Sequence, residues 1–377
     1  MRIYNRLGGA ELLSLGLLTE NVLLFFDVPR RYFEIGGNAA YLSLIISALV
    51  ALPVFFIVGL VLEKMPGEGL PDLMNRAFGT SGGKAANIII WLHLSLGAAL
   101  TARLLGEAII MTSIPEISIS IVVGGTLLFS VYAGYRGLNS LAKSCYVALP
   151  FIAAGVFVLM AISVTNWRSE FLYPLLGLGF RNTILSGALA AGAMGEILII
   201  AIFAGQAQIG VPRLKMLLTT LAVTMVVQVF IILSISMAFP YPVARELTLP
   251  YYMLSRSISI GIFLQRLESV FFVTWALGSI LKIAVLYNAG LFIYRHTFSI
   301  KDGVPLMVPY AGLCFALALL PDNYVEAASI SWHLLRLRGG LVTLALPLLA
   351  AGLYLWSTAR KARQTAGGPV PAGDGER

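Results

Sequence analysis

Apolar residues fill most of the chain in runs of about 20, and short polar segments separate these runs from one end to the other. A helix needs about 20 apolar residues to cross the hydrocarbon core of a bilayer. We therefore predict ten transmembrane helices, over residues 11–28, 39–62, 85–111, 117–135, 146–164, 184–204, 216–239, 266–293, 304–320 and 340–357. The short alternating segments of a membrane β-barrel do not occur, so the pattern predicts an all-α polytopic membrane protein.

The two ends of the chain differ from this pattern. Glu11 and Glu20 interrupt the first apolar run and no small-residue cleavage site follows, so we expect a retained helix rather than a removed signal peptide. Residues 1–357 are predicted to form a single ten-helix transmembrane domain. Residues 358–377 are basic and then rich in glycine and proline, which predicts a disordered cytoplasmic tail.

The composition agrees with a membrane protein and decides between two interpretations of the charge. Of the 377 residues, 58% are hydrophobic and only 12% are charged, too few charges for the surface of a soluble domain of this length. The net charge of +8 comes from basic residues spread over short loops, without the basic stripe and interleaved aromatic residues of a nucleic-acid-binding surface. With the N-terminus inside, the inner segments hold 15 Lys and Arg residues and the outer segments hold 8, Arg336 and Arg338 among them. Both termini are therefore predicted to be cytoplasmic.

Side chains typical of catalysis or metal binding are few and scattered. Cys145 lies near a loop and Cys314 lies inside a predicted helix, so we expect no disulfide framework. His93, His296 and His333 are far apart in the sequence, and no metal or nucleophile motif accompanies them. The sequence therefore predicts no enzyme activity, no metal site and no cofactor.

Ten helices divide into two halves of five, and a repeated half with an odd number of helices inserts upside down. Inverted repeats with broken first helices are typical of many secondary-transporter folds. In the first predicted helix, Thr19, Glu20 and Asn21 interrupt the apolar run at mid-depth, where such groups are costly on an unbroken helix facing lipid. We therefore expect the first helix to be broken at these three residues.

Small residues interrupt the sixth predicted helix at a corresponding depth. Gly187, Gly192 and Gly195 are weak helix formers, and Glu196 follows them. Close helix packing is sufficient to explain Gly187 and Gly192. It explains the Gly195–Glu196 pair less well, because packing does not require a carboxylate beside a glycine. Unwound backbone at both breaks would offer amides and carbonyls to a small zwitterion.

The third predicted helix carries a charged pair. Arg103 and Glu107 are four residues apart and so share one face of the helix. Pairing lowers the cost of both charges in the membrane, whereas a proton relay usually keeps a carboxylate free to titrate. We therefore favour a structural clamp over a relay.

The stretch "FLQRLESVFFVTWALGSILK" at residues 263–282 places three ionisable groups on the eighth predicted helix. At 100° per residue Glu268, Trp275 and Lys282 share one face, and Arg266 points the other way. Glu268 and Lys282 are about 21 Å apart along the helix and cannot pair, so Lys282 must find a partner inside the bundle. The predicted charge network is Arg103, Glu107, Arg266, Glu268 and Lys282. The predicted ligand-binding residues are Thr19, Glu20, Asn21, Gly192, Gly195, Glu196 and Trp275.

The same stretch resembles the Arg-x-Glu…Trp…Lys segment of the spore germination permease family, the B subunits of germinant receptors. Weaker similarities occur in the same order along the chain: "RLLGEAI" (103–109), "GYRGLNSLAKS" (134–144), "GEILIIAIF" (195–203), "PYP" (240–242) and "LPYYMLSRSISIG" (249–261). The chain departs from the family at Thr19–Glu20–Asn21, where glycines are usual, and at "TSIPEIS", which lacks the usual Thr-Pro. Glu20 could repel the carboxylate of an amino acid or hold its ammonium group.

The resemblance implies a fold like that of the amino acid/polyamine/organocation transporters, with ten helices. It also implies a place in the inner membrane of a bacterial endospore, in a complex with A- and C-type subunits. In that setting the B subunit senses a small nutrient germinant, often an amino acid.

Two functions remain open from the sequence. In the first, ligand binding at the broken helices shifts the bundle between two states that a partner subunit reads. In the second, the protein is a working permease that carries an amino acid with H⁺ or a metal ion, and Glu20 or Glu196 is the coupling carboxylate. Both functions require the same pocket.

Overall fold

The computed structural model describes residues 6–257 and 268–366, and helices account for nearly all of them. The first half of the chain holds α1 (Gly9–Asn21), η1 (Val22–Phe25), α2 (Val28–Gly36), η2 (Gly37–Ala39), α3 (Ala40–Glu63), α4 (Leu70–Thr112), α5 (Ile119–Arg136), α6 (Leu138–Ser163), η3 (Val164–Asn166) and η4 (Ser169–Leu172). The second half holds α7 (Phe180–Leu189), η5 (Ala190–Ile197), α8 (Leu198–Phe203), η6 (Ala204–Gln206), α9 (Arg213–Ala238), α10 (Tyr241–Ala244), α11 (Pro250–Ser257), α12 (Glu268–Thr297), α13 (Val304–Ala318), α14 (Tyr324–Ile330), η7 (Ser331–Arg338), η8 (Leu341–Ala345) and α15 (Leu346–Ala366). The elements η7 and η8 are π-helices, and the other η elements are 3-10 helices.

The length and composition of these helices confirm an all-α polytopic membrane protein. Eight helical segments in the described ranges are long and apolar enough to cross a membrane, and α13 is a shorter apolar helix. α1 has only 13 residues before its winding changes. The count of ten membrane crossings and the inverted repeat therefore stay predictions.

The last helical segment begins much earlier than predicted. Asn323 caps α14, and its side-chain oxygen accepts a hydrogen bond from the main-chain amide of Glu326 at 3.0 Å. From Tyr324 the chain is helical almost without interruption through α15. Arg336 therefore lies within this helical segment, which corrects its assignment to an outer loop. At the other end α15 runs on to Ala366, well into the segment that was predicted to be disordered.

The two helices with predicted breaks lie side by side and run in opposite directions. The main chain of Leu7, just before α1, donates to the Gln206 carbonyl and accepts from the Gln208 amide, each at 2.9 Å. These contacts join the start of α1 to the end of the α7–η5–α8 segment. Further along, a Cβ atom at Gly16 would lie 2.7 Å from the Ile200 side chain, so glycine permits the close approach of α1 and α8.

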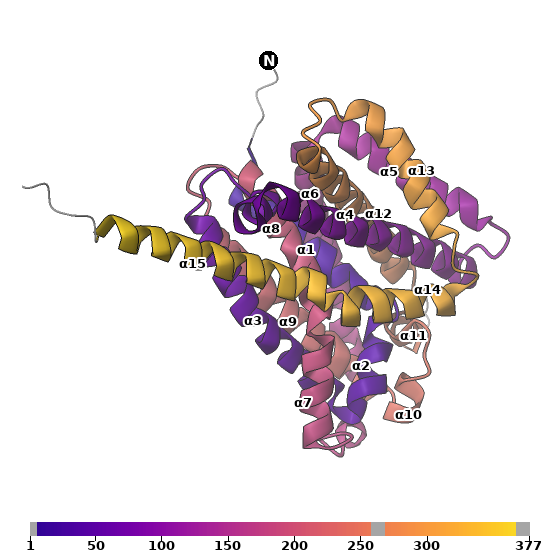
Figure 1. The fold of residues 1–377 in the computed structure, drawn as a ribbon. Helices are drawn as coiled ribbons and strands as arrows, with labels where there is room; N and C mark the ends of the chain where they lie inside the picture. Colours follow the sequence, from indigo (N-terminus) through magenta and orange to yellow (C-terminus); the bar gives the residue numbers. More distant parts are fainter. Residues whose placement is uncertain (1–5, 258–267, 367–377) are drawn as a thin grey trace, which may run out of the picture.

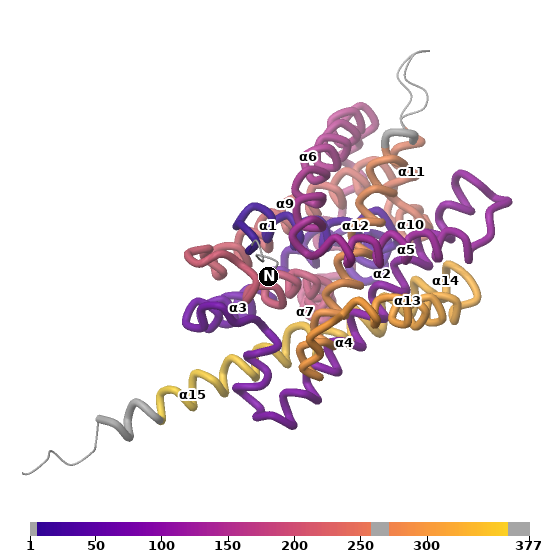
Figure 2. Tube along the Cα trace, turned by 90° about the horizontal axis from the view of Figure 1, so that it is seen from above, coloured from indigo at the N-terminus to yellow at the C-terminus, as the bar shows by residue number. Residues whose placement is uncertain are grey.

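α12 lies within the bundle and contacts α1, α4, α5 and α6. Figure 1 shows α12 and α4 crossing in the upper part of the molecule, with α7 and α10 at the opposite end. α15 crosses the bundle and projects beyond it, and the view from above in Figure 2 shows the same projection. The surface of α12 that faces α1 is therefore enclosed, and it carries the side chains described next.

Candidate ligand-binding site

The two predicted breaks are changes of helical winding rather than stretches of unwound chain. α1 remains α-helical through Asn21 and tightens to a 3-10 helix at Val22. α7 gives way to the 3-10 helix η5 at Ala190, and α-helical winding resumes after Ile197. A 3-10 stretch of this length is uncommon, and within a helix it often marks a hinge or strain. The expectation of unwound backbone at residues 19–21 and 192–196 is corrected accordingly.

Glu196 lies near the end of η5 and is almost completely buried, with 5% of its surface exposed. One of its carboxylate oxygens is 2.5 Å from Lys282 Nζ on α12, and the other is 2.7 Å from Arg336 Nη2 on η7. Both cations are buried as well. A cation on each oxygen offsets the charge of a carboxylate that is buried inside the bundle. Glu196 therefore links three helices through one side chain.

Lys282 extends this link to α1. Its Nζ also donates a hydrogen bond of 2.9 Å to the main-chain carbonyl of Thr19. The sequence required a buried partner for Lys282 but did not identify it, because Glu196 lies 86 residues away in the chain. We call Glu20, Glu196, Lys282 and Arg336 the central charge cluster.

Arg336 is the member of the central charge cluster that sequence reasoning missed. It stands on the π-helix η7 and has 2% of its surface exposed. Helical spacing of apolar residues does continue upstream of residue 340, through Ala327, Ala328 and Leu335, which are buried in the structure. This apolar spacing could have predicted that Arg336 lies in a helix rather than in a loop.

The glycines of η5 allow it to approach the last helical segment closely. A Cβ atom at Gly192 would lie 2.1 Å from the carbonyl oxygen of Arg336, and one at Gly195 would lie 2.3 Å from Thr343 Oγ1. Neither distance is compatible with a side chain. Packing therefore accounts for Gly195 as well as Gly192, which corrects the expectation that packing explains Gly195 poorly. The glycines bring η5 within reach of Arg336 and so permit its contact with Glu196.

Among residues 19–21, only the Thr19 carbonyl and the Glu20 side chain belong to or contact the central charge cluster. The Thr19 hydroxyl donates to the Leu15 carbonyl in its own helix at 2.6 Å, and only the Thr19 carbonyl reaches Lys282. Asn21 Nδ2 donates to Thr224 Oγ1 on α9 at 3.0 Å. Glu20 is the side chain of the three that lies within the electrostatic range of Glu196, Lys282 and Arg336.

Glu20 is completely buried, and neither of its carboxylate oxygens has a hydrogen-bond partner among the described residues. The main-chain amide of Glu196 lies close to the Glu20 carboxylate, but its geometry is not that of a hydrogen bond. Buried polar atoms in folded proteins almost always have partners, so two unsatisfied oxygens on one carboxyl group require an explanation.

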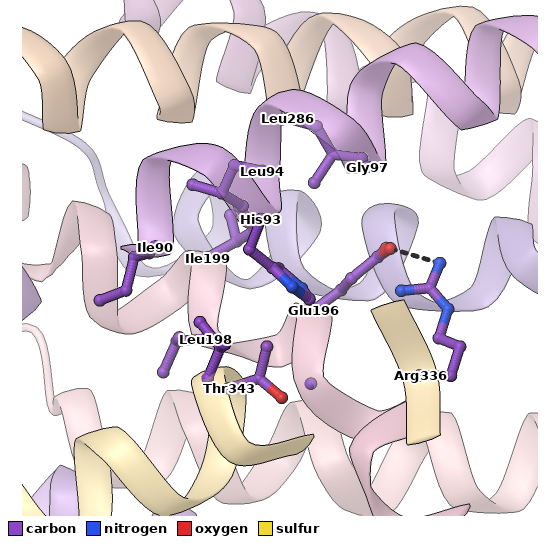
Figure 3. A pocket seen from close by; sticks show the side chains of 12 residues that line it. Ile90, His93, Leu94, Gly97, Glu196, Leu198, Ile199, Leu286, Arg336 and Thr343 are labelled. Atoms are coloured by element: carbon purple, nitrogen blue, oxygen red, sulfur yellow. Dashed lines mark ion pairs between the residues drawn. The ribbon is translucent and has the colours of Figure 1, made fainter. Parts of the chain in front are cut away.

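A cavity of about 10 Å³ lies beside Glu196, large enough for about one water molecule. Figure 3 shows His93 of α4 and Thr343 of η8 on its wall, with Arg336 paired to Glu196 at one side. Its remaining walls are largely aliphatic. The cavity is too small for an organic ligand, so binding at this centre requires the helices to move apart.

Trp275 and Ser279 precede Lys282 on α12, and both are fully buried. The Trp275 ring packs against Phe26 and Phe271, with ring centroids 5.6 and 5.7 Å away. Trp275 Nε1 and Ser279 Oγ have no hydrogen-bond partner among the described residues. The α1-facing side of α12 thus carries unsatisfied polar atoms as well as the Lys282 ammonium.

Arg103 and Glu107 pair as their spacing allows, with Arg103 Nη2 and Nε 2.7 and 2.9 Å from the same carboxylate oxygen. Arg103 also donates to the carbonyls of Ala318 and Asp322, at 3.4 and 2.9 Å. These bonds join α4 to the end of α13 and the turn that follows it. We call this group the α4 clamp.

Two residues of the predicted charge network have side chains outside the described part of the structure. Arg266 lies outside the described residues, as does the side chain of Glu268. Within the described ranges, no group of three or more His, Cys, Asp or Glu side chains is placed to hold a metal ion.

Comparisons with known proteins agree on a transport-type fold. A family model described as "Spore germination protein" matches residues 24–327. Among solved structures, the chain is similar to a Na⁺-coupled sialic acid symporter in a substrate-bound, outward-open state. The TM-score is 0.63 at 8% sequence identity, over 94% of this chain and 89% of the symporter chain. That identity establishes a shared fold only. Among curated protein sequences, none matches the chain significantly.

Proposed function

Because the chain belongs to the spore germination protein family, we propose that it is the membrane-embedded nutrient-sensing subunit of a spore germinant receptor. The family and the fold are of the permease type. Transporter folds of this type bind small molecules where helices change winding in the middle of the membrane. The observation that carries the proposal is the bridge from Glu196 to Lys282 and Arg336, which joins helices of changed winding at one buried point. We propose a small-molecule germinant as the ligand, with an amino acid as the first candidate.

The proposed signal is a shift between two arrangements of the helices. In the closed arrangement Glu196 contacts α12 and η7, and Lys282 contacts α1. The only cavity described beside Glu196 holds about one water molecule, so a germinant must bind a more open arrangement. A ligand shifts such an equilibrium by its difference in affinity for the two states.

The proposed setting is the inner membrane of the spore, with both termini in the cytoplasm and A- and C-type subunits as partners. The inward position of Arg336 supports this orientation, because it removes one positive charge from the predicted outer segments and widens the charge bias. We propose that the partner subunits respond to the change in helix arrangement, because the proposal assigns this chain no signalling reaction of its own.

An ion-coupled amino acid permease is the second candidate function. Glu20 favours it, because a buried carboxyl group that no described side chain pairs with is suited to exchange H⁺ or a metal ion during transport. The same residue serves a sensor equally well if it contacts the germinant.

The test uses purified protein in proteoliposomes, with binding and uptake of labelled amino acids measured on the same samples. Wild type is compared with Glu196→Gln and with Glu246→Gln, an exposed carboxylate that serves as the control. Binding that depends on Glu196, without uptake, supports the sensor. Uptake that follows an imposed ion gradient identifies a permease and overturns the sensor. Binding that Glu196→Gln leaves unchanged in a folded protein removes the central charge cluster from the proposal.

A further inference from the structure

We infer that Glu20 is the recognition site for a cationic ammonium group on the ligand, so that an amine, rather than a carboxylate, is what the protein reads first. The inference rests on the proposed function and deepens it, because it names the chemical class of the germinant. It follows from how the charges of the central charge cluster are distributed among their contacts.

The cluster holds two carboxylates and two cations, but the contacts are unequal. Glu196 takes a cation on each oxygen, and Lys282 divides its contacts between Glu196 and the Thr19 carbonyl. Glu20 contacts neither cation, although all four groups are buried. Burying a carboxylate without partners costs several kcal/mol in general, and a cation placed against it removes that cost. A ligand that carries the missing cation would complete the cluster.

The position of Glu20 is suited to such a ligand. It stands in the last turn of α1, directly after Thr19 and two residues before the winding changes at Val22. A change of winding at this point would move the Glu20 carboxylate relative to Lys282. Ammonium binding at Glu20 would therefore favour one winding over the other, which couples recognition to the proposed shift.

Other unsatisfied atoms indicate what the rest of the ligand offers. Among the residues that the structure describes, Arg336 Nε and Trp275 Nε1 are buried donors without an acceptor, and Ser279 Oγ is a buried hydroxyl without a partner. Ser279 and Trp275 lie about 4.5 and 10.5 Å from Lys282 along α12, within the span of a small organic molecule. Donors of this kind suit a carboxylate, a carbonyl or a hydroxyl equally well. The expected ligand is therefore a small amine with a hydrogen-bond acceptor, whether or not that acceptor is charged.

The experiment measures binding of three matched series to wild-type protein in proteoliposomes. The series are L-amino acids, their amides and the 2-hydroxy acids with the same side chains. Amino acids carry both charges, amides keep only the ammonium group, and hydroxy acids keep only the carboxylate. We expect members of the first two series to bind, and their 2-hydroxy acid counterparts to bind at least about tenfold more weakly.

The variants are Glu20→Gln and, as a control on the same helix, Glu11→Gln. Glu20→Gln is expected to weaken the best amine at least about tenfold, and Glu11→Gln is expected to leave it unchanged. Glu20→Asp, which keeps the charge, is expected to retain the preference for amines. If Glu20→Gln fails to fold, the ranking of the three series on wild type still decides the question.

Each other outcome overturns the inference in a different way. Hydroxy acids that bind as tightly as amino acids would show that the carboxylate is recognised, and the proposed sensor would survive. A response to Na⁺ that choline does not give, without a response to any amine, would assign Glu20 to an inorganic cation. No binding in any series would contradict the proposed function together with this inference.

Discussion

The α4 clamp and the central charge cluster both pair a buried arginine with a glutamate among apolar helices, the glutamate of the α4 clamp being partly exposed, but they differ in how completely their polar atoms are satisfied. In the α4 clamp, every nitrogen of the Arg103 guanidinium has an acceptor, from Glu107 or from a main-chain carbonyl. In the central charge cluster, both Glu20 oxygens and Arg336 Nε have none among the described residues.

The comparison separates a structural role from a binding role. A group whose task is to hold helices together gains nothing from an unsatisfied atom and pays a desolvation cost for it. A group that must bind a ligand keeps atoms free until the ligand arrives. The α4 clamp therefore fits its expected structural role, and the incomplete contacts of the central charge cluster favour binding.

The largest effect is expected for Lys282→Met. The variant leaves Glu196 with one cation and removes the ammonium donor to the Thr19 carbonyl, and breaking a buried ion pair by removing one partner costs about 3–5 kcal/mol. Chemical unfolding in mixed micelles measures the loss. Lys301→Met, at an exposed position, is the control and should change stability by less than about 0.5 kcal/mol. A Lys282→Met protein as stable as wild type would show that the bridge does not hold the bundle.

A smaller loss of stability, about 2–3 kcal/mol, is expected for Arg103→Met, because two carbonyls and one carboxylate lose their donor. The comparison predicts that ligand affinity in this variant stays at the wild-type value. Unfolding and binding are measured on the same preparation, with Arg136→Met at the exposed end of α5 as the control. A loss of ligand binding in stable Arg103→Met protein would erase the distinction between the two groups.

Gly195→Ala is expected to destabilise the protein by about 1–3 kcal/mol, because the new methyl group meets Thr343 at the point where η5 approaches η8. Gly125→Ala on α5 is the matched control, since no atom lies within 4 Å of the added Cβ. That control should be neutral or slightly stabilising, because alanine favours a helix more than glycine does. Equal stability of the two variants would mean that the last helical segment moves away at no cost.

The variant expected to cause no loss of stability is Glu20→Gln, which should be as stable as wild type or more stable. The side chain keeps its shape and loses a buried charge that no described contact offsets. This variant sharpens the comparison, since it should weaken ligand binding strongly without destabilising the fold. A loss as great as that of Lys282→Met would place Glu20 in the structural class instead.

Sequence patterns predicted the features that depend on neighbouring residues. Runs of apolar residues predicted the fold class, and helical spacing predicted that Trp275 and Lys282 share a face, which the structure buries. The spacing of Arg103 and Glu107 allowed the pair that forms. In each case one helix contains all the information, because side chains three, four or seven residues apart share a face in any α-helix.

The features that escaped prediction depend on how separate helices meet. Glu196 and Lys282 were both recognised as unusual, but their contact spans 86 residues and required the approach of η5 to α12. Arg336 was assigned to an outer segment because the last helix was predicted to begin only at residue 340, whereas the helical segment begins at Tyr324. The glycines of η5, where the winding is 3-10, pack against the last helical segment, and no local propensity specifies that partner.

The winding of η5 also sets a length. A 3-10 helix rises about 2.0 Å per residue and an α-helix about 1.5 Å, so the 8 residues from Ala190 to Ile197 are roughly 4 Å longer than they would be as an α-helix. Rewinding η5 would shorten its membrane crossing by that amount and draw α7 and α8 toward each other. Because the end of α8 is joined to the chain before α1, the displacement would be transmitted to the opposite end of α7. A change in the winding of η5 would thus displace its two ends along the helix axis by about one to two hydrogen-bond lengths.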